Sequence, residues 1–179
     1  MNSQRAGGQG TSDSGATVVL IGAPGAGKTR TGRRLARLLD VAFIDTDRQI
    51  VERHGTIADI FAEHGEPHFR SLERDVVAEA LREHAVVTLG GGAVLDPRTQ
   101  ADLGQFPVVQ LTVTAEAVQA RIGGGKRPLL ADGIDSWRAI VGARQPLYDR
   151  LSQLSIDTSG QPLDGVAQQI ADWLERRQS

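Results

Sequence analysis

The 179-residue chain contains no cysteine. It therefore has no disulfide framework, no thiolate nucleophile and no cysteine-based zinc site, a composition that fits a reducing cytosol. The formal net charge is only -2. A balance so close to neutral predicts no global electrostatic attraction to nucleic acid or to an anionic membrane, so any basic site has to be local.

Signals for export or membrane insertion are also missing. The first fifteen residues, MNSQRAGGQGTSDSG, lack the charged and apolar regions of a signal peptide, and no apolar run elsewhere is long enough to span a bilayer. The length suits one ordinary domain with a substantial core. We expect a cytoplasmic protein with a disordered leader at 1–15 and a single domain at 16–179.

Asparagine and lysine are scarce. The only asparagine is Asn2, so the chain lacks the asparagine of a GTPase NKxD motif and that of a protein-kinase catalytic loop. Both classes are excluded. Lys28 and Lys126 are the only lysines, against eighteen arginines. Because lysine is so rare in this chain, a lysine at a motif position is not expected by chance. Lys28 is therefore a candidate functional residue.

Lys28 ends a phosphate-binding pattern. Gly22, Gly27, Lys28 and Thr29 follow the spacing GxxxxGK[ST], between a predicted strand and a predicted helix. Small residues let backbone N–H groups turn toward a phosphate, the helix adds its positive end, and the threonine hydroxyl can hold Mg²⁺. The alternative is a structural strand-to-helix turn, which this spacing in this context disfavours. The pattern predicts a P-loop.

The rest of the chain alternates between strands and helices. A glycine-rich, polar stretch at about 122–134 predicts a flexible flap. Five strands alternating with helices imply a three-layer α/β domain with a mostly parallel sheet and right-handed crossovers. Apolar runs predict strands at 17–22, 41–45, 85–89, 108–113 and 154–157, and apolar periodicity predicts helices at 29–40, 48–54, 56–64, 67–81, 114–122, 135–152 and from 163 to about 174.

Carboxylates and glycines follow two of these strands. The third strand, AVVTL, has no acidic residue, so a conventional Walker B aspartate is absent. Asp45 and Asp47 are the available candidates, one to lie near Mg²⁺ and the other to face the hydroxyl group of an acceptor. The alternative for both is a strand-end turn with helix capping. Gly90, Gly91 and Gly92 leave the backbone closely approachable at the same edge of the sheet.

Cationic side chains carry weaker signals. Arg70, Arg127 and Arg144 lie near helix or loop edges, where a guanidinium can grip a carboxylate with two hydrogen bonds. Taken singly, each of them is better explained as a surface arginine. The arginines at 30–37 predict a solvated helix face, because the chain is net acidic and has no interleaved aromatics. The histidines lack zinc-type spacing and are expected to be exposed: His54, His64, His68 and His84.

Taken in order, the motifs resemble those of the shikimate kinase family over residues 17 to about 175. The resemblance implies a P-loop kinase with strand order 2-3-1-4-5, a substrate-binding segment at about 46–76 and a mobile lid at about 122–134. It also implies transfer of the ATP γ-phosphate to the 3-hydroxyl of shikimate, in the pathway to chorismate and aromatic amino acids. The motifs are GAPGAGKT, DTD at 45–47, TIADIF, GEPHFRSLE, TLGGGAV, RPLL at 127–130 and RQPLY at 144–148.

The same resemblance implies a role for each matching residue. Asp47, Lys28 and Arg127 are expected to be catalytic, and Thr29 and, through water, Asp45 to hold the metal. The expected nucleotide-binding residues are Gly25, Ala26, Gly27, Lys28, Thr29, Arg30, Arg121, which stacks on adenine, and Arg127. The expected shikimate-binding residues are Asp47, Arg70, Gly91, Gly92, Arg144, Phe61, Phe69, Glu73, which holds Arg70, Pro128 and Leu129.

The expected ligands are ATP, Mg²⁺ and shikimate, for a monomer that binds neither nucleic acid nor membrane. Two alternatives stay open. A relative acting on another small hydroxyl substrate, such as a gluconate kinase, would not need Arg70 and Arg144 to converge on one carboxylate. A non-catalytic nucleotide-binding switch or nucleic-acid-associated ATPase would hydrolyse nucleotide without an acceptor, and any nucleic-acid binding would depend strongly on salt.

Overall fold

The computed structural model describes residues 15–122 and 133–178. In these residues the strands form one five-stranded sheet of order β2-β3-β1-β4-β5, and every pairing is parallel. The sheet confirms both the predicted parallel arrangement and the strand order implied by the family resemblance. The strands are β1 (Val18–Gly22), β2 (Ala42–Asp45), β3 (Ala85–Thr88), β4 (Val108–Thr112) and β5 (Leu154–Asp157).

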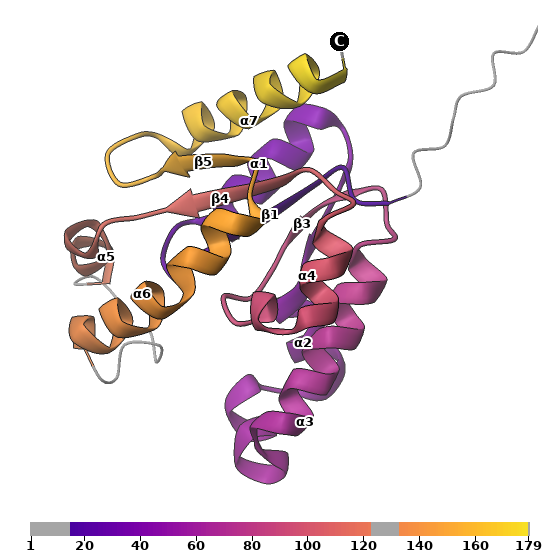
Figure 1. The fold of residues 1–179 in the computed structure, drawn as a ribbon, viewed down its shortest axis with the longest axis vertical. Coiled ribbons are helices and arrows are strands. Elements are labelled where there is room, and N and C mark those ends of the chain that lie inside the picture. The colour runs from indigo at the N-terminus through magenta and orange to yellow at the C-terminus, as the bar shows by residue number, and fades with distance from the viewer. Residues whose placement is uncertain (1–14, 123–132, 179) are drawn as a thin grey trace, which may run out of the picture.

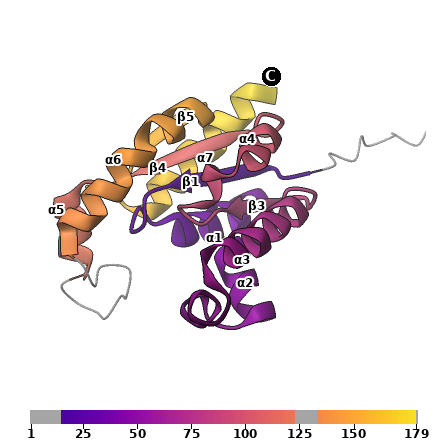
Figure 2. The same ribbon diagram turned by 60° about the horizontal axis from the view of Figure 1, so that its bottom comes forward.

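Helices cover both faces of the sheet and complete the three predicted layers. Helices α1 and α7 pack on one face, and α3, α4 and α6 pack on the other (Figures 1 and 2). None of the described helices has the length and hydrophobicity of a membrane span. The helices are α1 (Lys28–Leu39), α2 (Thr46–His54), α3 (Ile57–Ala80), α4 (Pro97–Leu103), α5 (Ala115–Ile122), α6 (Gly133–Leu151) and α7 (Leu163–Gln178), with a 3₁₀ turn η1 (Ala93–Leu95).

Strand β1 lies at the centre of the core. Val18 and Leu20 pack with α1 and α7, whereas Val19 and Ile21 pack with α3, α4 and α6. A strand covered on both faces has no solvent-exposed positions, which explains the unbroken apolar run before the P-loop. Each such side chain contributes about 1.5–3 kcal/mol by its burial. The P-loop therefore follows a strand that is buried at every position.

Helix α3 is long but not continuous. Its backbone is non-helical at Gly65 (φ 77°, ψ 172°), which confirms the predicted interruption before Pro67. At its start, Thr56 Oγ1 accepts a hydrogen bond from the Asp59 backbone N–H (3.2 Å), which is the cap contact of the predicted capping box, and it donates one to Asp59 Oδ2 (2.6 Å). Helix α2 and the part of α3 before Gly65 extend below the sheet in Figure 1.

Two features differ from the sequence prediction. The η1 turn and α4 were not predicted, although Asp96 caps α4 by accepting from the Arg98 and Thr99 backbone N–H groups and Pro97 occupies its first turn. Helix α2 begins at Thr46 rather than at residue 48. The earlier start places Asp47 in the first turn of a helix instead of in a loop.

Candidate active site

The P-loop connects β1 to α1. Gly25 and Gly27 have φ of 85° and 86°, a left-handed conformation that L side chains rarely adopt, so glycine is needed at both positions. Lys28 Nζ donates to the Gly22 carbonyl (2.8 Å) and to the Ala23 carbonyl (3.0 Å). The lysine is thus folded back over a loop whose shape suits a phosphate.

The charge of Lys28 is set by its surroundings. Burial lowers its pKa to about 8, and the neighbouring Asp47 and Asp45 carboxylates oppose that shift. The group remains mostly cationic at neutral pH. A dianionic or more highly charged ligand beside it would stabilise the ammonium further.

Two oxygen ligands meet next to the P-loop. Thr29 Oγ1 donates to Asp45 Oδ2 at 2.6 Å, and the other carboxylate oxygen accepts from the Arg48 backbone N–H at 3.2 Å. Asp45 is therefore a helix cap and, at the same time, half of an oxygen pair of the kind Mg²⁺ prefers. The described residues contain no group of three or more His, Asp or Glu side chains that could hold a metal. The pair fits a metal that takes its remaining ligands from phosphate and water.

Asp47, in the first turn of α2, lines a cavity beside the P-loop. This cavity of about 400 Å³ is lined by Lys28, Thr29, Asp45 and Asp47 among others. Burial raises the pKa of Asp47 and the Asp45 charge raises it further, while Lys28 and Arg70 oppose the shift. A carboxylate with a raised pKa is a better proton acceptor than an exposed one.

The triple glycine, residues 90–92, brings three charged side chains together. A Cβ on the first glycine would lie 2.4 Å from Asp47 Oδ1, and one on the third would lie 2.4 Å from Arg70 Nη1. On the middle glycine it would lie 3.4 Å from Arg144 Nη1. Side chains from α2, α3 and α6 therefore converge on the end of β3, and the first and third glycines leave room that any larger residue would fill.

Arg70 is held by two acidic residues. Its Nη1 donates to Glu73 Oε2 at 2.6 Å, and both Nε and Nη2 donate to Glu66 Oε1 at 3.2 Å. Glu73 is only 4% exposed. Burial raises the pKa of Glu73, and the hydrogen bond and charge of Arg70 oppose the shift. The expected contact between Glu73 and Arg70 is present, whereas the contact with Glu66 was not predicted.

Tyr148 ties Arg144 to the triple glycine. The phenol donates to the Gly91 carbonyl at 2.7 Å and is hydrogen-bonded by Arg144. Burial raises the pKa of Tyr148, so the group stays a neutral donor. Sequence reasoning gave this residue no role, although it is the only tyrosine in the chain and belongs to the RQPLY motif.

The two expected aromatic residues of the substrate site pack together. Phe61 and Phe69 have ring centroids 4.8 Å apart and come from opposite sides of the Gly65 kink. Phe69 is buried, and Phe61 is 36% exposed. The pair offers an apolar surface whose position depends on the kink.

Side chains outside the P-loop fix its carbonyl groups. Arg121 donates to the Gly25 carbonyl at 3.0 Å and to the Thr158 carbonyl. Thr158 Oγ1 in turn donates to the Ala26 carbonyl at 2.9 Å, and Trp137 Nε1 donates to the Pro24 carbonyl at 2.9 Å. Thr158 and Trp137 were missed because nothing local in the sequence connects them to residues more than a hundred positions away.

The contacts described above do not include four of the predicted site residues. Arg30 is exposed on α1, and its carbonyl accepts from Arg34 Nη1 at 3.2 Å. Arg127, Pro128 and Leu129 lie outside the described residues, as do most of the predicted lid and residues 1–14 of the predicted leader.

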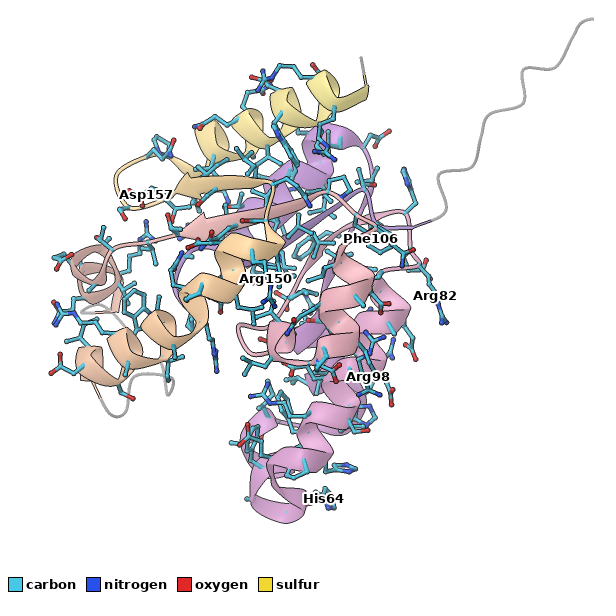
Figure 3. All side chains as sticks on the ribbon, viewed as in Figure 1. His64, Arg82, Arg98, Phe106, Arg150 and Asp157 are labelled. Carbon is cyan, nitrogen blue, oxygen red and sulfur yellow. The ribbon has the colours of Figure 1, made fainter. Side chains whose placement is uncertain are left out.

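The histidines are exposed, as predicted. Figure 3 shows His64 at the bottom of the view, next to the Gly65 break in α3 and far from the sheet. The predicted solvated face of α1 is also present: Arg33 covers the Phe43 ring at 5.7 Å, and Arg34 pairs with Asp164 at 2.6 Å.

Comparison with known proteins gives the family of the chain. The family model described as shikimate kinase matches residues 24–175. A shikimate kinase from Thermobifida fusca is 47% identical over 158 residues, which cover 86% of this chain and 92% of that protein. The solved structure of a shikimate kinase from Acinetobacter baumannii in complex with shikimate is 32% identical, with a TM-score of 0.83 and coverage of 92% of this chain and 95% of that one.

A gluconokinase from Sinorhizobium meliloti is also similar in structure, with a TM-score of 0.64 over 90% of this chain and 92% of that one. At 17% identity that likeness shows the fold alone. The family match and the 47% identity to the Thermobifida fusca shikimate kinase carry more information, because they are likenesses of sequence over most of the chain. The chain therefore belongs to the shikimate kinase family of ATP-dependent kinases.

Proposed function

We propose that this chain transfers the γ-phosphate of ATP to the 3-hydroxyl of shikimate, giving shikimate 3-phosphate and ADP. The observation that carries this proposal is the convergence of Asp47, Arg70 and Arg144 on the triple glycine, beside a P-loop. A carboxylate can accept a hydrogen bond from a hydroxyl group, and two guanidinium groups can bind a carboxylate. Shikimate, a ring with one carboxylate and three hydroxyls, satisfies both requirements.

The donor end of the site is the P-loop. The backbone N–H groups of Gly25, Ala26 and Gly27 bind the phosphates, and Lys28 leaves its carbonyl partners to contact them. Thr29 would hold Mg²⁺ directly and Asp45 would hold it through water. The 2.6 Å hydrogen bond between the two side chains keeps their oxygen atoms close together. When bound, Mg²⁺ supplies positive charge that neutralises the phosphate oxygens.

The acceptor end is centred on Asp47. Its carboxylate orients the 3-hydroxyl of shikimate and takes the hydroxyl proton as the oxygen bonds to the γ-phosphorus. The bond from that phosphorus to the β,γ-bridging oxygen breaks, and ADP leaves with the electron pair. The raised pKa of Asp47 supports this role, because proton transfer is most effective when the base has a pKa near the working pH.

The remaining residues position the two substrates. Arg70 and Arg144 bind the shikimate carboxylate, and Glu73 and Tyr148 hold these arginines in place. Further contacts to shikimate come from Gly91, Gly92, Phe61, Phe69, Pro128 and Leu129, while Arg30, Arg121 and Arg127 contact the nucleotide, with Arg127 carried by the lid at 122–134.

The protein acts as a cytoplasmic monomer, without nucleic acid or membrane. Its single domain comprises residues 16–179, preceded by a leader at 1–15. The shikimate-binding segment is at about 46–76, and closure of the lid after the substrates bind excludes water.

An ADP-release assay with ATP, Mg²⁺ and a panel of hydroxy acids tests the proposal. Shikimate is expected to stimulate ADP release, and gluconate is not. Stimulation by gluconate alone would favour the alternative kinase of another hydroxy acid. ADP release that is independent of every acceptor would favour the nucleotide-binding switch.

A further inference from the structure

Glu66 contacts the arginine that the proposed function assigns to the substrate carboxylate. One oxygen, Oε1, accepts from both Nε and Nη2 of Arg70 at 3.2 Å. These two donors lie side by side on one edge of the guanidinium, the arrangement that binds a planar carboxylate. Glu66 therefore makes the kind of contact that a bound acid would make.

The other donors of Arg70 are less accessible. Nη1 donates to the buried Glu73 at 2.6 Å. Nη1 and Nη2 also lie 2.4 Å and 2.9 Å from the point where a Cβ of Gly92 would be, so the end of the guanidinium lies against the backbone. The edge formed by Nε and Nη2 is consequently the one that suits an incoming carboxylate best, and it is the edge that Glu66 occupies.

The two acidic partners of Arg70 differ in exposure. The Glu66 side chain is 61% exposed, whereas the Glu73 side chain is 5% exposed. An exposed ion pair contributes about 0–1 kcal/mol, because water and salt replace it readily. Glu73 is thus a fixed partner, and Glu66 is one that a ligand can displace at little cost.

Glu66 also lies at the break in α3. It follows Gly65, whose φ of 77° and ψ of 172° interrupt the helix, and it precedes Pro67. A small rotation of the backbone at the break would move the Glu66 carboxylate relative to Arg70 without disturbing the rest of α3.

We propose that Glu66 occupies the place of the substrate carboxylate on Arg70 and leaves it when the acid binds. This inference rests on the proposed function, because it needs Arg70 to bind shikimate. Glu66 is then a competitor of the substrate carboxylate and weakens the binding of shikimate. A ligand without a carboxylate has no group that takes the place of Glu66 on Arg70, so it leaves this ion pair intact and does not compete with it.

The test compares Glu66→Gln with wild type and with Glu63→Gln as a matched control. Glu63 is also an exposed acid of α3, and its ion-pair contact is with His64 at 3.8 Å rather than with Arg70. The Michaelis constant for shikimate is measured at saturating ATP and Mg²⁺, together with the Kd of shikimate without nucleotide. The same quantities are measured for shikimate methyl ester, which lacks the charge.

Glu66→Gln is expected to lower the Michaelis constant and the Kd for shikimate about two- to fivefold, the factor that an exposed ion pair supplies. In Glu66→Gln, the constants for the methyl ester and the turnover number should stay near those of wild type. In Glu63→Gln, all of these quantities should stay near those of wild type. The proposal would be overturned if the constants for shikimate were unchanged or higher in Glu66→Gln. It would also be overturned if Glu63→Gln lowered them equally, or if Glu66→Gln lowered the constants for the ester equally. Lack of shikimate-dependent turnover by wild type would instead contradict the proposed function.

Discussion

At the level of single residues, the proposed chemistry works against stability. Asp47 is held near Asp45 in a largely buried position, and its pKa is raised. A buried carboxylate that ionises at neutral pH destabilises the folded state relative to the unfolded chain. The carboxylate proposed to accept the proton therefore lowers the stability of the protein when no ligand is bound.

Replacing Asp47 by Asn should change stability and catalysis in opposite directions. A raised folded-state pKa contributes stability below the unfolded-state value, near 3.8, and this contribution is lost as the pH rises through the folded-state pKa. Without ligands, Asp47→Asn should therefore raise the melting temperature at pH 7–8, while the turnover number falls about 10²–10⁴-fold.

Thermal unfolding at several pH values, with kinetics at pH 7.5, checks this prediction. Near pH 4 the carboxyl is protonated to a larger extent in both states, so the gain in melting temperature should shrink there. A variant that is less stable than wild type at pH 8, or that keeps full turnover, would contradict the proposed role of Asp47.

The Arg144→Lys substitution tests whether Arg144 binds the acceptor. A lysine keeps the positive charge but loses the planar pair of donors and the hydrogen bond to Tyr148. We expect the Michaelis constant for shikimate to rise about 10–100-fold, the range for a lost hydrogen bond to a charged group, with the constant for ATP unchanged. Steady-state kinetics in both substrates checks this. A change confined to ATP would mean that Arg144 does not contact the acceptor.

Residue contacts divide into those that local sequence can predict and those that it cannot. The pair of Arg70 and Glu73 follows from helical spacing of three residues. The same spacing rule allows Glu66 and Arg70 at four residues, but Gly65 lies beside Glu66 and made a regular helix there unsafe to assume. The contact of Tyr148 with Gly91 joins distant elements, and nothing local specifies it.

At the level of secondary-structure elements, the break in α3 determines where the two aromatic residues proposed for the substrate site lie. Phe61 precedes it and Phe69 follows it. Glycine at 65 and proline at 67 made the break predictable. The η1 turn and α4 were harder to predict, because the run from Ala93 to Leu103 is short and its apolar residues do not repeat at a clear helical period.

Gly65→Ala should disturb this break. The backbone angles at Gly65 belong to a region that is essentially restricted to glycine, so a Cβ costs about 1–3 kcal/mol or forces the helix to straighten. We expect a lower melting temperature and a higher Michaelis constant for shikimate, because Phe61 moves away from Phe69. Gly142→Ala in α6 is the matched control.

At Gly142 the backbone is helical and a Cβ would meet no atom within 4 Å. Alanine there should leave stability unchanged or raise it by about 0.5–1 kcal/mol. Thermal unfolding and shikimate kinetics of the two variants check the prediction. Equal behaviour of both would show that the angles at Gly65 carry no functional constraint.

At the level of the whole molecule, the site lies where three neighbouring strands end. β1 leads into the P-loop, β2 into Asp45 and Asp47, and β3 into the triple glycine. In an open parallel sheet the ligand crevice lies at the carboxyl ends of the strands, so the fold class and the motifs together predict this location. The arginines from α3 and α6 could be assigned only from the family resemblance, because their approach depends on how helices pack over the sheet.

The central claim is that this crevice joins an ATP donor to a carboxylate-bearing hydroxyl acceptor. Its most direct test is ³¹P NMR of the products formed from ATP, Mg²⁺ and shikimate by the purified protein. The account predicts one equivalent of shikimate 3-phosphate for each ADP, and no phosphorylated product when gluconate replaces shikimate. ADP accompanied by inorganic phosphate alone, or phosphate transferred to gluconate but not to shikimate, would contradict it.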